Sequence, residues 1–291
     1  MTEPAPLRLG QHTFGPDQRL IMAIVNRTPD SFYDQGATYE LDAALKRVHE
    51  VVAAGADVVD IGGVKAAPGV EVPAEEEIRR IVDVIAASRA AYPDLVISVD
   101  TFRHEVAEAA CEAGADLIND AWGGFDDKLL EVAAERGAAL VCTHAGGLPP
   151  RTRPLRITYD DVVADILDRT VNLAERAAEA GVERDRILLD PGHDFGKNTR
   201  HSLEVTRRLG ELVATGWPVL VSLSNKDFVG ETLDLPIGQR VYGTLAAIAV
   251  TAWQGARMFR VHEVRETREV LDMVSSIQGH RPPARTIRGL A

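Results

Sequence analysis

The sequence is organised around one stretch, Arg186–Asn198, which reads R-I-L-L-D-P-G-H-D-F-G-K-N. Ile187–Leu189 is a short apolar run, typical of a strand that is buried on both faces. Asp190 follows at its carboxyl end, where a core strand should carry no charge without a partner. A proline and two glycines then form a loop whose backbone can approach a ligand closely. The stretch therefore predicts a strand that ends in a ligand-binding loop.

The same order of features recurs along the chain. A helical pattern ends in glycine, an apolar strand follows, and polar residues close it, as in A-A-G-A-D-V-V-D-I ending at residue 61 and E-A-G-A-D-L-I-N-D ending at residue 120. Helical patterns lie at about residues 41–54, 74–91, 103–113, 127–136, 158–180, 200–214, 237–255 and 264–278. Roughly eight such units predict an α/β fold of the (β/α)8 TIM barrel type. A doubly wound open sheet is the alternative, although the first β-to-α turn lacks the glycine fingerprint of that fold.

We expect one main domain, since the 291 residues are 45% hydrophobic and can bury an ample core. Residues 1–19 are predicted to form an N-terminal hairpin segment, residues 20–279 the barrel, and residues 280–291 a loose C-terminal tail.

The overall charge narrows the class of partner. The net charge is −12 and the pI about 5.2, so neither nucleic acid nor an anionic membrane is expected as a partner. No run reaches 18 apolar residues and the start, M-T-E-P-A-P, lacks a signal-peptide pattern, so a cytoplasmic location is expected. Two cysteines, Cys111 and Cys142, make neither a disulfide framework nor a zinc site.

Polar residues gather at the predicted strand ends, which in a TIM barrel open on one face. They are Asn26, Asp60, Asp100, Asn119, Asp120, His144, Asp190, Ser222, Ser224, Lys226, Arg260 and His262. Acids and amides fill the early and middle strands and suit a heterocycle with N–H donors. The basic residues of the last two strands, with Asn26, suit an anion such as diphosphate. A single strand-end aspartate is as often a helix cap, but caps do not explain a whole set on one rim.

The chain resembles dihydropteroate synthase from about Leu20 to Ser276. The phrases that carry the resemblance are N-R-T-P-D-S-F, V-V-D-I-G-G, S-V-D-T, I-N-D, L-L-D-P-G-H-D-F-G-K-N, S-N-K and F-R-V-H-E-V. The resemblance implies a pterin-binding TIM barrel, usually a homodimer, that works in folate biosynthesis. Such an enzyme joins 6-hydroxymethyl-7,8-dihydropterin diphosphate to p-aminobenzoate with the help of magnesium and releases diphosphate.

The resemblance also assigns roles to residues of this chain. The pterin ring would be held by Asp100, Asn119, Asp190 and Lys226. The diphosphate would be held by Asn26, Arg260 and His262, with Asn26 also near the magnesium ion. The p-aminobenzoate pocket would be bordered by Phe195 and Ser224. The catalytic residues would be Lys226, Arg260 and His262.

The chain departs from the family in its loops. After the second strand the family reads G-G-E-S-T-R-P-G, whereas Gly62–Gly69 reads G-G-V-K-A-A-P-G, with the degenerate positions Val64, Lys65, Ala66 and Ala67. Asn225 replaces the arginine of S-R-K in the loop after the seventh strand. Further departures are Arg27, Gln35 and Ala145, together with His193 and Asp194 in the loop after Asp190.

These departures affect the diphosphate more than the pterin. A charge-assisted hydrogen bond contributes about 1.5–3 kcal/mol, so losing one arginine and two hydroxyls removes on the order of 4 kcal/mol, roughly a thousandfold in rate. The first hypothesis is therefore a synthase-like pterin-binding paralogue with little or no synthase activity. The second is a working synthase in which Lys65 and Arg27 substitute for the lost groups. The third is a non-catalytic scaffold or a methylfolate-type barrel.

The predicted homodimer has one candidate surface in the sequence. The apolar helix Leu245–Trp253 is compatible with a partner surface and equally with ordinary barrel packing.

Overall fold

The computed structural model describes residues 6–26, 36–64, 69, 71–147, 149–151 and 157–287. The departures Arg27, Gln35, Lys65, Ala66 and Ala67 lie outside these residues.

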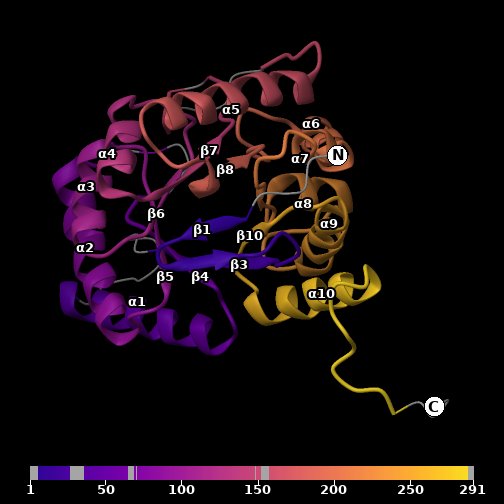
Figure 1. The fold of residues 1–291 in the computed structure, drawn as a ribbon, viewed down its shortest axis with the longest axis horizontal. Coiled ribbons are helices and arrows are strands. Elements are labelled where there is room, and N and C mark those ends of the chain that lie inside the picture. The colour runs from indigo at the N-terminus through magenta and orange to yellow at the C-terminus, as the bar shows by residue number, and fades with distance from the viewer. Residues whose placement is uncertain are drawn as a thin grey trace.

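Eight parallel strands form the central barrel (Figure 1). They are β3 (Leu20–Asn26), β4 (Val58–Gly62), β5 (Val96–Asp100), β6 (Leu117–Asp120), β7 (Ala139–Thr143), β8 (Ile187–Asp190), β9 (Leu220–Ser222) and β10 (Met258–Val261). Their order is β8-β7-β6-β5-β4-β3-β10-β9. A parallel bridge between Leu189 and Val219 joins the two ends of this sheet, and Leu189 N donates to Pro218 O across 2.9 Å. The predicted TIM barrel is confirmed, and the open-sheet alternative is wrong.

The helices form a ring around the strands, because each β-to-β crossover packs its apolar stripe on the outside of the barrel (Figure 1). They are α1 (Gly36–Ala53), α2 (Ala74–Ala91), α3 (His104–Glu112), α4 (Lys128–Arg136), α5 (Val162–Glu179), α6 (Thr199–Arg207), α7 (Leu209–Val213), α8 (Asp227–Leu233), α9 (Val241–Trp253) and α10 (Val264–Ile277), with a short 3-10 turn at Arg184–Arg186.

Two predicted helices differ in the structure. The pattern at 200–214 is divided at Arg208, whose φ of −103° and ψ of 16° leave the helical region. The side chain of Gln254 satisfies a backbone N–H at this break, because its Oε1 accepts from Gly210 N across 3.0 Å. The pattern at 237–255 gives α9, and the short helix α8 before it was not predicted.

The N-terminal hairpin closes the end of the barrel at which the strands begin. Its strands are β1 (Leu7–Leu9) and β2 (His12–Phe14), which pair antiparallel. Leu7 and Leu9 are fully buried and join a core cluster with the inward residues at the starts of the barrel strands, such as Met22 and Leu188. The hairpin therefore completes the interior core at the end of the barrel opposite the carboxyl ends of the strands. The predicted boundaries at residues 19 and 279 stay predictions.

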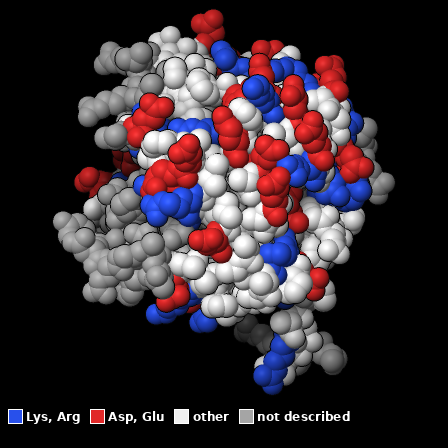
Figure 2. Space-filling view, turned by 90° about the vertical axis from the view of Figure 1, so that its left-hand side faces the viewer, with Lys and Arg blue, Asp and Glu red and all other residues white. Residues whose placement is uncertain are grey.

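Outside the barrel, oppositely charged side chains pair along the helices. Figure 2 shows acidic and basic residues interspersed on the side that carries α2, α3 and α4. Arg136, for example, donates to both Glu108 and Glu112. No helix in the described part of the chain is long and apolar enough to cross a membrane.

Candidate functional site at the barrel mouth

Strand register places the predicted pterin residues in one row. Asn26 pairs with Gly62, Gly62 pairs with Asp100, and Asp100 pairs with Asn119. Because neighbouring parallel strands hold these residues at one level, their side chains meet at the carboxyl end of the barrel. A Cβ atom on Gly62 would lie 3.4 Å from Asp100 Cβ and 3.6 Å from Asn26 Oδ1, so Gly62 stands between these two side chains.

A buried hydrogen-bond network forms the floor of the mouth. Arg260 donates from Nε to Asp60 Oδ2 and from Nη2 to Asp100 Oδ2, each across 2.6 Å. Ser98 Oγ donates to Asp60 Oδ1 at 2.6 Å, and Asn119 Nδ2 donates to Asp60 Oδ2 at 3.1 Å. Asp60 therefore orients both Arg260 and Asn119. This role for Asp60 was not predicted, although its place at a strand end was the available signal.

Burial and paired charges shift the ionisation of this floor. Burial raises the pKa of Asp100, and the Arg260 guanidinium opposes that rise. Burial alone would lower the pKa of Arg260, but the carboxylates of Asp60 and Asp100 outweigh it and raise the pKa. Arg260 was predicted to hold diphosphate, and here both of these donor groups serve aspartates, so that role stays a prediction.

Asp190 and Lys226 lie at the side of the mouth formed by β8 and β9. Asp190 is 5% exposed, and its Oδ1 accepts from Gly192 N across 2.7 Å. Lys226 Nζ donates to His193 O across 2.5 Å and lies 4.5 Å from the centre of the Phe195 ring. The pKa of Asp190 is raised by burial, against the charges of Lys226 and others. The structure thus brings Phe195 and Lys226 together, and the second pocket bordered by Phe195 and Ser224 stays a prediction.

Lys197 holds the loop after β8 in place through hydrogen bonds to its backbone. Its ammonium contacts His144 Nδ1 at 2.6 Å and donates to Gly192 O and Phe195 O, each across 3.0 Å. His144 in turn bonds Asp165 Oδ2 through Nε2 at 2.7 Å. Burial lowers the pKa of Lys197 to about 7 and that of His144 to about 4. Lys197 was not predicted, and its presence within D-F-G-K-N was the only sequence signal for it.

The rim at β9 and β10 is a second connected group. Ser224 Oγ donates to Glu263 Oε2 across 2.7 Å and lies 3.0 Å from His262 Nδ1. Asn225 Nδ2 donates to Glu263 Oε1 across 3.1 Å. Glu263 therefore fixes the side chains of Ser224 and Asn225, and the sequence analysis did not predict this role. Asn225 adopts a left-handed conformation with φ of 57°, which asparagine tolerates better than most residues.

Asp120, at the end of β6, has a structural role. Asp120 accepts from Trp122 N at 2.9 Å and from Gly124 N at 2.6 Å, so it caps the loop after β6.

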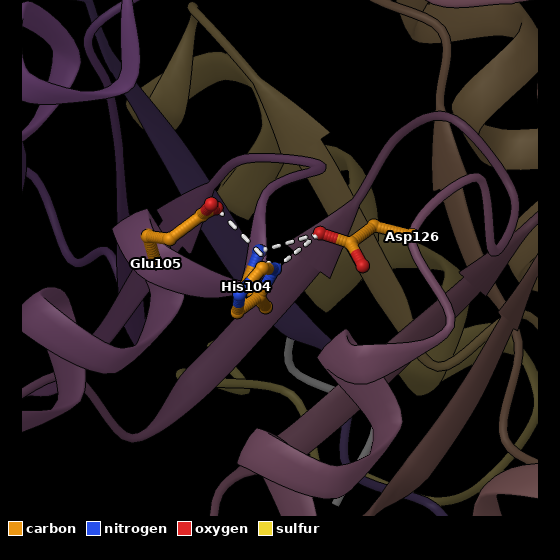
Figure 3. Close-up of side chains that lie close together, drawn as sticks. All are labelled: His104, Glu105 and Asp126. Atoms are coloured by element: carbon orange, nitrogen blue, oxygen red, sulfur yellow. Dashed lines mark hydrogen bonds and ion pairs between the residues drawn. The ribbon is translucent and has the colours of Figure 1, made fainter.

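Of the described residues, one set of three places its potential metal ligands within 4.8 Å of one another, namely His104, Glu105 and Asp126 (Figure 3). Asp126 Oδ2 there accepts from His104 N at 3.0 Å and contacts His104 Nδ1 at 2.7 Å, so it already caps α3.

Comparisons with known proteins agree with this geometry. The family described as pterin binding enzyme matches residues 22–262. The inactive dihydropteroate synthase 2 of Mycobacterium leprae (strain TN) is 62% identical over 279 residues, covering 94% of this chain and 96% of that protein. The dihydropteroate synthase of Escherichia coli (strain K12) is 37% identical over 257 residues, covering 88% of this chain and 90% of that protein.

The chain belongs to the dihydropteroate synthase family of pterin binding enzymes. A solved structure shares its fold: dihydropteroate synthase from Xanthomonas albilineans in complex with 7,8-dihydropteroate, with a TM-score of 0.84 and 36% identity, covers 94% of this chain and 99% of that one. The family and the fold expected from the sequence motifs are therefore confirmed. The individual roles of the mouth residues are not tested by these similarities.

Proposed function

We propose that the barrel mouth binds a pterin-like ring through Asp100, Asn119 and Asp190, and that the protein has little or no dihydropteroate synthase activity. One observation carries the binding site. Among the described residues, no donor hydrogen bonds Asp190 Oδ2, Asp100 Oδ1 or Asn119 Oδ1, while the opposite atom of each side chain is engaged. A pterin edge offers amino and ring N–H donors, which fit such acceptors.

The low activity is supported by the rim beside Lys226. The position where the family carries a guanidinium holds Asn225, whose amide is bound to Glu263. An amide cannot supply the charge or the forked donors of arginine to a leaving diphosphate. The relative from Mycobacterium leprae that is 62% identical is named an inactive dihydropteroate synthase 2, which favours the same conclusion.

A magnesium ion, when bound together with the diphosphate, would supply charge stabilisation to it. A protein-built magnesium site normally needs one or two free carboxylates, but Asp60 and Asp100 are paired with Arg260. Asn26, which is exposed at the end of β3, offers one amide oxygen. The residues therefore fit a magnesium ion that arrives as a diphosphate complex, with Asn26 as its protein contact.

A working synthase is the second candidate, and the retention of two basic residues at the end of one strand favours it. Arg260 lies on β10 and His262 directly follows it. In that case Asn26, Arg260 and His262 would stabilise the charge that develops on the departing diphosphate. The arylamine would attack from the pocket beside Phe195 and Lys226. Turnover decides between the two candidates.

Pterin binding is tested by calorimetry with 6-hydroxymethylpterin. Asp190→Asn should weaken binding about 10- to 100-fold, because a charge-assisted hydrogen bond contributes about 1.5–3 kcal/mol. Asp227→Asn is the matched control, since Asp227 lies near the mouth but pairs with Arg240 at 2.9 Å. Equal affinities for wild type and Asp190→Asn would remove Asp190 from the pterin site.

A homodimer through α8, α9 and α10 also belongs to this proposal. α9 and α10 pack against each other, and large apolar side chains on and beside these helices are exposed: Leu233, Ile237, Tyr242, Val250, Trp253, Met273 and Ile277. Large apolar side chains exposed on adjacent helices are compatible with a protein partner. Trp253→Glu should convert a dimer to a monomer in light scattering, whereas Ile287→Glu should not. A cytoplasmic location also stays a prediction.

A further inference from the structure

Asp194 directly precedes Phe195, which is predicted to border the second pocket. It is one of the two departures from the family's glycine-aromatic run, and it adopts a left-handed conformation with φ of 65°. Side chains other than glycine are uncommon there, and local hydrogen bonds are what retain an aspartate in this conformation. Those bonds show where its charge is held.

The Asp194 carboxylate is fixed between α6 and α8. Its Oδ1 accepts from Ser202 Oγ across 2.9 Å, and its Oδ2 accepts from Phe228 N across 3.2 Å. Phe228 follows Lys226 by two residues and is the second residue of α8. The first turn of α8, directly after Lys226, therefore already has a protein carboxylate bound to its backbone.

This carboxylate acts on Lys226. Burial lowers the pKa of Lys226, and the charge of Asp194 opposes that effect more strongly than the charge of Asp190 does. The ammonium also donates to His193 O at 2.5 Å. Lys226 beside the Phe195 ring is thus balanced by protein acceptors, which reduces its attraction for a ligand anion.

On the side of β9 and β10, Glu263 adds a further carboxylate next to the loop that carries Lys226. Glu263 accepts from Ser224 Oγ and Asn225 Nδ2, and Asn225 brings no charge where the family has arginine. The part of the barrel mouth around Lys226 therefore carries the carboxylates of Asp190, Asp194 and Glu263. Like charges held in a partly dehydrated site repel more strongly than they do in water.

We propose that the pocket beside Phe195 accepts a neutral or cationic aromatic ring and rejects an arylamine that bears a carboxylate, with Asp194 as the residue that sets this specificity. The inference rests on the proposed function, because it concerns the second pocket of the same mouth. It names the chemical class of the second ligand: an uncharged or positively charged aromatic amine in place of p-aminobenzoate.

The test compares two rings of nearly the same shape that differ in charge. Dissociation constants for 4-aminobenzamide and 4-aminobenzoate are measured by calorimetry, with and without saturating 6-hydroxymethylpterin. Wild type should prefer the amide at least about tenfold. Asp194→Asn, which removes the charge but keeps one oxygen that can accept from Phe228 N or Ser202 Oγ, should lower that preference about tenfold, which corresponds to 1.4 kcal/mol.

Asp234→Asn is the matched control, because Asp234 also has a left-handed conformation, with φ of 54°, and lies at the other end of α8. It should leave the preference unchanged. An unchanged preference in Asp194→Asn, or a wild type that prefers the carboxylate or binds neither ring, overturns the inference. Failure of the pterin to bind overturns the proposed function instead, and the ring comparison without pterin still decides the specificity.

Discussion

Arg260 and Asp60 form an ion pair at the centre of the barrel mouth, with Arg260 Nε donating to Asp60 Oδ2 across 2.6 Å and no exposed surface on the Asp60 side chain. The same carboxylate accepts from Ser98 and Asn119. The acid that orients Arg260 is thus also the one that orients the amide of Asn119. Loss of its charge should affect stability and ligand binding together.

Asp60→Asn should lower the free energy of unfolding by about 3 kcal/mol, because it leaves the largely buried Arg260 without one of its two carboxylates. The measurement is urea denaturation followed by circular dichroism. Glu175→Gln removes one partner of an exposed ion pair with Arg184 and should cost less than about 1 kcal/mol. Similar losses in both variants would show that Asp60 does not hold the floor.

Leu9→Ala should lower the free energy of unfolding by about 2–4 kcal/mol, since it leaves a cavity in the core that the hairpin completes. Leu9 is 0% exposed and packs in the core cluster at the end of the barrel at which the strands begin. Ile287→Ala, at a side chain that is 71% exposed, should change the urea midpoint little. A Leu9→Ala protein as stable as wild type would mean that the hairpin does not contribute to the core.

His144 should contribute a loss of stability as the pH falls from 6.5 to about 4. Its folded pKa is lowered to about 4 by burial and by the charge of Lys197. In that pH window the unfolded chain binds a proton at His144 that the folded chain does not, so acid favours unfolding. The contribution reaches about 3 kcal/mol.

The pH test compares urea midpoints of wild type and His144→Gln from pH 4 to pH 7. The variant should lose part of the slope, because glutamine does not titrate. Two parallel curves would exclude His144 as a source of the pH dependence. Asp100 acts in the opposite sense, since its pKa is raised by burial, and it should act equally in both proteins.

Synthase activity should return when the diphosphate-binding loops are restored together. The variant combines Lys65→Ser, Ala66→Thr, Ala67→Arg and Asn225→Arg, and diphosphate release should rise on the order of a hundredfold or more, because two guanidinium groups and two hydroxyls are regained. Asn225→Arg alone is the control and should give a smaller gain. No gain in the combined variant would place the loss of activity elsewhere, with Asp194 as the next residue to replace.

Much of the fold could be predicted, because the barrel repeats one local pattern. The helix α2 was predicted at its observed bounds, since Pro73 precedes it, acids fill its first turn and Pro93 follows it closely. The helix α8 was missed because seven residues are too few to show a helical period. The division at Arg208 depends on Gln254 from another helix, a contact that no local pattern reveals.

The site was predicted by position rather than by pairing. Parallel strands bring their carboxyl ends to one rim, so the strand-end rule found Asp100, Asn119 and Asp190. It did not find that Arg260 turns to Asp60 and Asp100, because side-chain direction depends on the three-dimensional arrangement of charges. Lys197 and Glu263 were missed for the same reason, since each lies beyond a strand end and acts through neighbouring loops.

The most direct test of the central claim is diphosphate release by the wild-type protein with saturating 6-hydroxymethyl-7,8-dihydropterin diphosphate, p-aminobenzoate and magnesium. A retained pterin site with dismantled diphosphate chemistry predicts turnover about a thousandfold below an ordinary rate of about 1 s⁻¹. Turnover near 1 s⁻¹ would contradict the account and establish a working synthase.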